Sequence, residues 1–122
     1  MRNPVGWFEI SVNDMARAKA FYEGVFGVKL SKIESPGNEM WAFPSNMEGY
    51  GAAGCLSQVS DAPLGGKGTL VYFSCADCAV EAARAPQYGG RIQQGKTSIG
   101  PYGHFALLVD PAGNVIGLHS MQ

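Results

Sequence analysis

The sequence carries an internal repeat, and this repeat constrains the possible folds more than any other feature. A strand, a helix and three further strands follow one another twice, with equivalent positions 63 residues apart. Asp14 and Asp77 are candidate helix N-caps at this spacing. Read without a gap, the same spacing pairs Gly54 with Gly117 and Ser57 with Ser120. A chain built in this way is expected to fold as two copies of one supersecondary unit.

In each half, the spacing of apolar residues and the positions of turn residues predict the helices and strands. Residues 7–12 alternate in polarity as a strand does, and residues 15–26 place apolar side chains at helical spacing before Gly27. The predicted strands and helices are, in the first half, 7–12, 15–26, 28–34, 40–43 and 52–58, and in the second half, 70–75, 80–85, 91–94, 104–109 and 115–120. Each half is therefore predicted to be a βαβββ module.

Composition narrows the class of protein. A chain of 122 residues with 46% hydrophobic and 16% charged residues is typical of one globular domain. The net charge of -1, with scattered basic residues, argues against nucleic-acid binding. Since no apolar run reaches the ~20 residues of a membrane span and no signal-peptide pattern opens the chain, we expect no membrane association and a cytoplasmic location.

Three cysteines fit a reducing compartment better than a disulfide framework. Cys75 and Cys78 have the C-x-x-C spacing of half a zinc site, but no second pair lies nearby. We favour a role for both as small apolar residues at the end of a strand and the start of a helix. No cofactor is predicted from them.

Residues 18–27, with the pattern Ala-x-x-Phe-Tyr-x-x-x-Phe-Gly, and the closing segment 110–120, DPAGNVIGLHS, resemble the vicinal oxygen chelate superfamily. This superfamily includes glyoxalases, bleomycin-resistance proteins and extradiol dioxygenases. The resemblance implies an α+β fold in which tandem βαβββ modules form a curved, partly open mixed β-barrel with the helices outside. It implies a single glyoxalase-like domain over residues 1–122, with module one at about 4–59 and module two at about 67–122.

The resemblance also implies a groove lined by the sheet faces that point away from the helices. If Phe8, Ile10 and Val12 pack under the first helix, the alternate residues of that strand face the groove. The positions expected to face it are Trp7, Glu9, Ser11, Leu70, Tyr72, Ser74, Gly54, Leu56, Gly117 and His119. Aromatic residues that we expect beside it are Trp41, Tyr50 and Tyr102, where large rings commonly line small-molecule sites.

Metal-dependent relatives hold their ion with one residue from the first and one from the last strand of each module. Carried over to this sequence, those positions are Trp7, Leu70, Gly54 and Gly117, and none of these side chains ligates a divalent ion. We therefore predict no metal of the usual kind. The alternative is a rearranged metal site made from Glu9, His104 and His119.

Glu9 and His119 are the candidate catalytic residues, because burial in an apolar groove would shift a carboxyl or imidazole pKa towards neutrality. A purely structural role for both stays open. The candidate ligand-binding residues are Trp7, Ser11, Trp41, Tyr50, Leu70, Tyr72, Tyr102 and His104.

We expect a glyoxalase-like protein that binds a small molecule, or a metal-independent enzyme, with an apolar and aromatic groove. One alternative is a metal-dependent lyase or isomerase of the lactoylglutathione lyase type. Another is a bleomycin-type antibiotic-binding resistance protein, although the net charge of -1 gives little attraction for a cationic drug. We expect a homodimer, since sheet edges favour pairing.

Overall fold

The computed structural model describes all residues except 1, 36 and 60–67. It divides into two compact units, one of residues 7–70 and one of residues 1–6 with 71–122. The predicted boundary between modules, after residue 59 and before residue 67, falls largely outside the described residues. We call the first the N-terminal module and the second the C-terminal module, and describe each by itself. The strands β1 (Val5–Val12) and β5 (Thr69–Ser74) cross the division and are counted with the module that holds most of their residues, β1 with the N-terminal and β5 with the C-terminal module.

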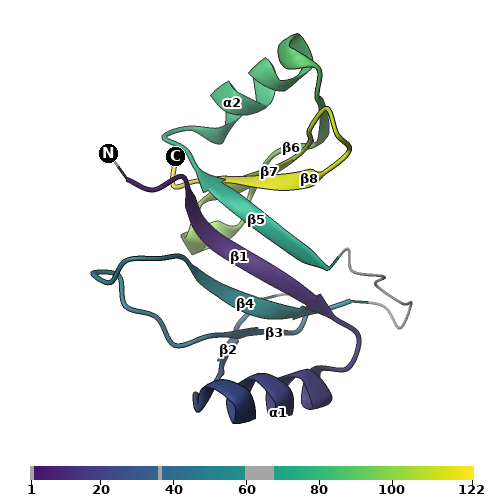
Figure 1. The fold of residues 1–122 in the computed structure, drawn as a ribbon. Coiled ribbons are helices and arrows are strands. Elements are labelled where there is room, and N and C mark those ends of the chain that lie inside the picture. The colour runs from purple at the N-terminus through teal and green to yellow at the C-terminus, as the bar shows by residue number, and fades with distance from the viewer. Residues whose placement is uncertain (1, 36, 60–67) are drawn as a thin grey trace. The chain divides into compact units, whose positions relative to one another are not determined.

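The N-terminal module contains one helix and four strands (Figure 1). The strand order is β2-β3-β4-β1, in which β1 and β4 run parallel and the other neighbours are antiparallel. The elements are β1 (Val5–Val12), α1 (Met15–Phe26), β2 (Ser31–Ile33), β3 (Met40–Ala42) and β4 (Ala53–Gln58).

The C-terminal module repeats this plan with the order β6-β7-β8-β5 and a parallel pair of β5 and β8. Its elements are β5 (Thr69–Ser74), α2 (Cys78–Arg84), the 3-10 helix η1 (Ala85–Tyr88), β6 (Arg91–Ser98), the 3-10 helix η2 (Gly100–Tyr102), β7 (His104–Val109) and β8 (Val115–Ser120). The α+β class and the two βαβββ modules are thus as predicted.

Both helices begin where the sequence predicts a cap. The Asp14 carboxylate accepts a hydrogen bond from the Arg17 backbone N–H at 3.1 Å, and the Asp77 carboxylate accepts one from the Ala79 N–H at 3.0 Å. Gly27 ends α1 with a φ of 64°, a left-handed conformation that glycine adopts without steric cost. The second helix begins at Cys78, two residues earlier than predicted.

Strand β2 is shorter than the predicted segment 28–34. Leu30, which precedes it, is 3% exposed, and its backbone N–H donates to the Glu23 carboxylate at 2.8 Å. This bond fixes the chain to α1, so that Leu30 packs into the core and does not extend the sheet.

Each helix covers one face of its own sheet. Under α1 the core contains Val12, Met15, Leu30 and Leu56, with Ile10 and Tyr22 packed against it. Under α2 it contains Cys78, Ala82, Ala106, Leu108 and Leu118. All three cysteines are free, and Cys78 is a fully buried apolar residue, as the sequence suggested.

The last strand of each module also holds the start of that module's helix. Gln58 Oε1 accepts from the Met15 backbone N–H at 2.9 Å, and Ser120 Oγ accepts from the Cys78 N–H at 3.0 Å. Met15 and Cys78 are 63 residues apart, whereas Gln58 and Ser120 are 62 apart. The repeat therefore does not run without a gap, and Gln58, not Ser57, is the counterpart of Ser120.

Among the described residues, no helix is both long and apolar enough to span a membrane.

Candidate functional site

The helix-free face of the N-terminal sheet carries the polar residues of β1. The parallel register places Trp7 beside Ala53, Glu9 beside Cys55 and Ser11 beside Ser57. Ile10 and Val12 pack under α1, so their neighbours in β1 point to the other side. Trp7, Glu9 and Ser11 therefore lie on the face that the alternation predicted.

The predicted placement of Gly54 and Leu56 on this face is wrong. Leu56 pairs with Ile10 and is fully buried in the core under α1. A Cβ atom at Gly54 would lie 2.5 Å from the Phe8 ring, so that glycine also belongs to the helix-covered side. The physical reason is the one-residue difference in the repeat, because a shift of one residue exchanges the two faces of a strand. Cys55 takes the expected place.

In the C-terminal module the predicted face is correct. Tyr72 pairs with Gly117 and Ser74 with His119, whereas Leu118 packs under α2. A Cβ atom at Gly117 would collide with the Tyr72 ring, which shows that the ring lies across this glycine. Leu70, two residues before Tyr72 in β5, shares the face of Tyr72 by alternation.

Glu9 has a defined orientation. Its Oε2 accepts a hydrogen bond from the Trp7 indole Nε1–H at 3.2 Å. Both residues are half-buried, and their strand neighbour Cys55 has no exposed surface. The carboxylate thus stands on a face with an indole on one side and a buried thiol beside it.

Burial, together with the nearby charge of Glu9, raises the pKa of the Cys55 thiol from 9.0 to about 12. The thiol is therefore neutral at physiological pH. It can donate a hydrogen bond, but it is not a thiolate nucleophile.

This pKa shift predicts a pH dependence of stability. In the unfolded chain the Cys55 thiol ionises near pH 9.0, whereas in the folded chain it keeps its proton up to about pH 12. Between these values the unfolded state holds fewer protons, so stability is expected to fall as the pH rises above about 9, with no contribution from this thiol below that pH. Thermal unfolding of the wild type and of Cys55→Ala from pH 7 to 11 measures it: the variant should lose stability less steeply, and parallel curves would contradict the assignment.

His119 has one ring nitrogen engaged. Its Nε2 lies 2.6 Å from the backbone carbonyl oxygen of Tyr102, which can only accept, so in a hydrogen bond Nε2 carries the proton. In the neutral ring, Nδ1 is then an acceptor. Tyr102 is thus linked to His119 through its backbone, while its side chain is 54% exposed.

His104 does not join His119, contrary to the rearranged metal site considered above. In the antiparallel register His119 pairs with Phe105, and His104 pairs with Ser120, which bonds to the start of α2. The two imidazoles therefore point to opposite faces of the sheet. His104 Nδ1 is buried without a hydrogen-bond partner. The hydrogen bond from Lys96 is the main cause that lowers the pKa of the nearby Asp77 carboxyl, and His104 makes the smallest contribution.

Trp41, expected beside the groove, lies on the other side of its sheet from Glu9. It pairs with Leu56 and packs against the core under α1, with Lys19 Nζ 3.4 Å from the ring centroid. Tyr50 is fully exposed in the β3–β4 connection, where it helps to line a small hollow of about 180 Å³. Neither residue lies on the same sheet face as Glu9 within the N-terminal strands.

The corrected register changes which residues stand at the metal-ligand positions of the resembling family. The counterpart of Gly117 is Cys55, so the four positions become Trp7, Cys55, Leu70 and Gly117. Of these four side chains only the Cys55 thiol can ligate, and one protein ligand is too few for a zinc-type site. Within the described residues, no three His, Cys, Asp or Glu side chains form a group that could hold an ion. These donors do not fit the family's metal.

Sequence reasoning missed Cys55. Residues 53–58 form a buried strand, and their sequence, Ala-Gly-Cys-Leu-Ser-Gln, does not alternate in polarity and so gives no register. The available signal was the match of Gln58 with Ser120, because each side chain carries an oxygen that can accept a hydrogen bond from a backbone N–H at the start of a helix.

The comparisons with known proteins agree with this fold. A sequence profile of the Glyoxalase/Bleomycin resistance protein/Dioxygenase superfamily matches residues 5–118. No curated protein sequence matches the chain significantly. A variant of the methylmalonyl-CoA epimerase of Streptomyces coelicolor, solved with 2-nitronate-propionyl-CoA, is similar at a TM-score of 0.69 and 16% identity, over 98% of this chain and 95% of that chain.

Two solved proteins of unstated activity are similar as well. A hypothetical protein of Bacillus halodurans has a TM-score of 0.72 and 12% identity, over 97% of this chain and 94% of its own. An uncharacterized protein of Methanosarcina mazei has a TM-score of 0.64 and 17% identity, over 100% of this chain and 94% of its own. At these identities the structures establish the fold and not the activity. By its sequence profile and its two βαβββ modules, the chain belongs to the Glyoxalase/Bleomycin resistance protein/Dioxygenase superfamily.

Proposed function

We propose that the protein binds a small organic molecule on the helix-free face of the N-terminal sheet, with Glu9 as its polar anchor and without a metal ion. The observation that carries this proposal is the Glu9 carboxylate, which the Trp7 indole orients at 3.2 Å on a half-buried face. Oriented carboxylates beside aromatic surface are typical of sites that fix a ligand through one or two polar contacts.

The chemistry of this face favours one class of ligand. A carboxylate only accepts hydrogen bonds, so the ligand should present O–H or N–H groups or a positive charge to Glu9. The Trp7 ring offers flat apolar surface to an aromatic or aliphatic body. The neutral Cys55 thiol adds no charge to attract an anion. We therefore favour a neutral or cationic ligand over an acidic one.

The same carboxylate supplies a base if the bound molecule is turned over, because it can accept a proton from a carbon or oxygen acid held against it. In the C-terminal module, the acceptor Nδ1 of His119 is a second such group. Catalysis by either residue is part of this proposal. It would be metal-independent, since the donor set described above does not fit an ion.

Glu9→Gln tests the anchor, and the chain offers a matched control. Glu39 accepts from the Trp41 indole at 2.9 Å, two residues away in sequence, as Glu9 does from Trp7, but it is not on the proposed face. Because a hydrogen bond to a charged group contributes about 1.5–3 kcal/mol, Glu9→Gln should weaken binding by at least about tenfold. Glu39→Gln should leave the affinity unchanged.

Three test ligands distinguish the anionic, cationic and neutral ligand classes. Methylmalonyl-CoA represents the anionic thioesters of the epimerase relatives, bleomycin a cationic drug, and catechol a neutral aromatic donor. Calorimetric titration with each, and native mass spectrometry of the protein purified without chelator, give affinities and any carried ligand or metal. Unchanged affinity in Glu9→Gln would remove this residue from the site, and stoichiometric nickel, zinc or iron would overturn the metal-free reading.

A further inference from the structure

A hollow of about 340 Å³ lies where β1 ends and α1 begins. Its apolar walls come from Val12, at the end of β1, and from Ala18, Phe21 and Tyr22 of α1. Val12 packs under α1, and alternation along β1 therefore puts it on the opposite side of the strand from Glu9. We call this space the α1 hollow. It is separate from the face that carries Glu9, and its volume is in the range of small-molecule sites.

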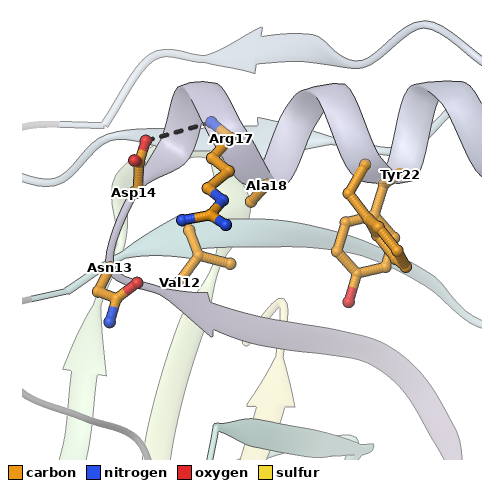
Figure 2. A pocket seen from close by; sticks show the side chains of 7 residues that line it. Val12, Asn13, Asp14, Arg17, Ala18 and Tyr22 are labelled. Carbon is orange, nitrogen blue, oxygen red and sulfur yellow. Dashed lines mark hydrogen bonds between the residues drawn. The ribbon is translucent and has the colours of Figure 1, made fainter.

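The two ends of the α1 hollow differ in chemistry. Figure 2 shows Asn13, Asp14 and Arg17 at one end and the Tyr22 ring at the other. Phe21 also lines the hollow, and its ring centroid lies 5.1 Å from that of Tyr22 in an edge-to-face arrangement. The hollow thus offers two opposite charges at one end and aromatic surface at the other.

Both charged groups are available to a ligand. The Asp14 carboxylate caps α1 through Oδ1, which accepts from the Arg17 backbone N–H at 3.1 Å, and Oδ2 is left for another donor. Within the described part of the chain, neither the Asp14 carboxylate nor the Arg17 guanidinium belongs to an ion pair. The equivalent cap of α2 differs, since Asp77 pairs with Lys96 Nζ at 2.9 Å. The N-terminal module therefore keeps two unpaired charges beside an apolar hollow, whereas the C-terminal module neutralises its cap.

We propose that the α1 hollow binds a free amino acid with an aromatic side chain. The ammonium group of the ligand faces the Asp14 carboxylate, and its carboxylate faces the Arg17 guanidinium, so that each charge meets the opposite one. The aromatic side chain lies against Phe21 and Tyr22, which removes apolar surface of both molecules from water. A zwitterion fits better than a simple ion, because Asp14 repels an anion and Arg17 repels a cation.

The exposure of the hollow sets its strength. Asn13, Asp14 and Arg17 are exposed, and Phe21 is 59% exposed, so water screens the charges and part of the ligand stays in solvent. At the binding efficiency usual for organic ligands, phenylalanine should bind with a dissociation constant of about 1 mM. This inference concerns the α1 hollow alone and does not depend on the ligand proposed for Glu9.

The first test compares three probes by NMR titration of the isotope-labelled full chain. Phenylalanine carries both charges, 3-phenylpropanoate lacks the ammonium group, and 2-phenylethylamine lacks the carboxylate. Phenylalanine should bind about fivefold more tightly than either analogue, because each analogue loses one ion pair and gains one repulsion. The largest shifts should fall on backbone amides of residues 12–22. Equal affinity for the three probes, or no shift with phenylalanine well above the expected constant, overturns the proposal.

The second test removes each charge without disturbing the helix. Asp14→Asn keeps a good N-cap, and Arg17→Gln keeps a good helix former, so thermal stability should change little. Each variant should weaken phenylalanine binding by about fivefold. Asp77→Asn is the matched control, since it alters the cap of α2 in the same way and should leave the affinity unchanged. Unchanged affinity in both α1 variants, or an equal loss in all three, contradicts the assignment of the charges.

The third test locates the aromatic side chain of the ligand and separates the two proposed sites. Phe21→Ala should weaken phenylalanine binding by about threefold, whereas Tyr88→Ala, at a position 77% exposed in η1, should not change it. Glu9→Gln should also leave phenylalanine binding unchanged. A loss in Glu9→Gln without a loss in Phe21→Ala would move the amino acid to the helix-free face and overturn the α1 hollow as its site. Failure of the Glu9 anchor with other ligands would leave the expected results at Asp14 and Arg17 as they are.

Discussion

Replacing Leu56 with alanine is expected to lower the free energy of unfolding by about 3 kcal/mol, because the substitution leaves a cavity in a packed core. Leu56 has no exposed surface and contacts the cluster under α1. Equilibrium unfolding in urea measures the effect, which corresponds to more than a hundredfold in the folding equilibrium. Val115→Ala, at a position 39% exposed, should cost less than about 1 kcal/mol.

The Leu56→Ala variant also distinguishes a position in the core from a position in the ligand-binding site. If Leu56 lies under α1, ligand affinity measured well below the melting temperature should not change in Leu56→Ala. If the free energy of unfolding fell by less than about 1 kcal/mol and ligand affinity were also lost, Leu56 would lie on the helix-free face. That outcome would contradict the register of β4.

Gly117→Ala is expected to destabilise the protein by about 2 kcal/mol, since a Cβ atom there collides with the Tyr72 ring in the neighbouring strand. Gly95→Ala is the matched control. No atom lies within 4 Å of a Cβ at that position in β6, so alanine there should be neutral or slightly stabilising. Thermal and urea unfolding of both variants measure the difference.

A double variant identifies the Tyr72 ring as the cause. Combining Gly117→Ala with Tyr72→Ala should cost less than the sum of the two single changes, because the smaller side chain removes the collision. Strict additivity would show that the ring does not block this position. The outcome bears on function, because the family resemblance carries one metal-ligand position over to Gly117. An acidic side chain introduced there would meet the ring before it could meet an ion.

Much of the fold follows from local chemistry that the sequence displays. The caps Asp14 and Asp77, the left-handed Gly27 and the alternation in β1 each depend on a few adjacent residues, and all were found from those residues. The order of the elements follows from the repeat. These features are predictable because their causes are local.

The candidate site was predictable only where a strand alternates clearly. Alternation placed Glu9 and Tyr72 correctly, whereas β4 gave no such pattern and its register was taken from the repeat. Trp41 and His104 were assigned by their position along the chain, although the side of the sheet depends on pairing with Leu56 and Ser120. Pairing between distant segments is a tertiary property. A shift of one residue in the pairing moves every side chain of the strand to the opposite face of the sheet.

The two hydrogen bonds that tie Gln58 to Met15 and Ser120 to Cys78 also show what the two modules keep in common. Each copy of the duplicated unit keeps its last strand attached to the start of its helix, although a different side chain now makes the bond. The turn before the last strand differs in length between the modules: Ala42 and its partner Cys55 are 13 positions apart in sequence, whereas their counterparts Leu107 and Gly117 are 10 apart. The modules therefore share their hydrogen-bonded frame and differ in this turn, and the longer turn carries Tyr50 and its hollow.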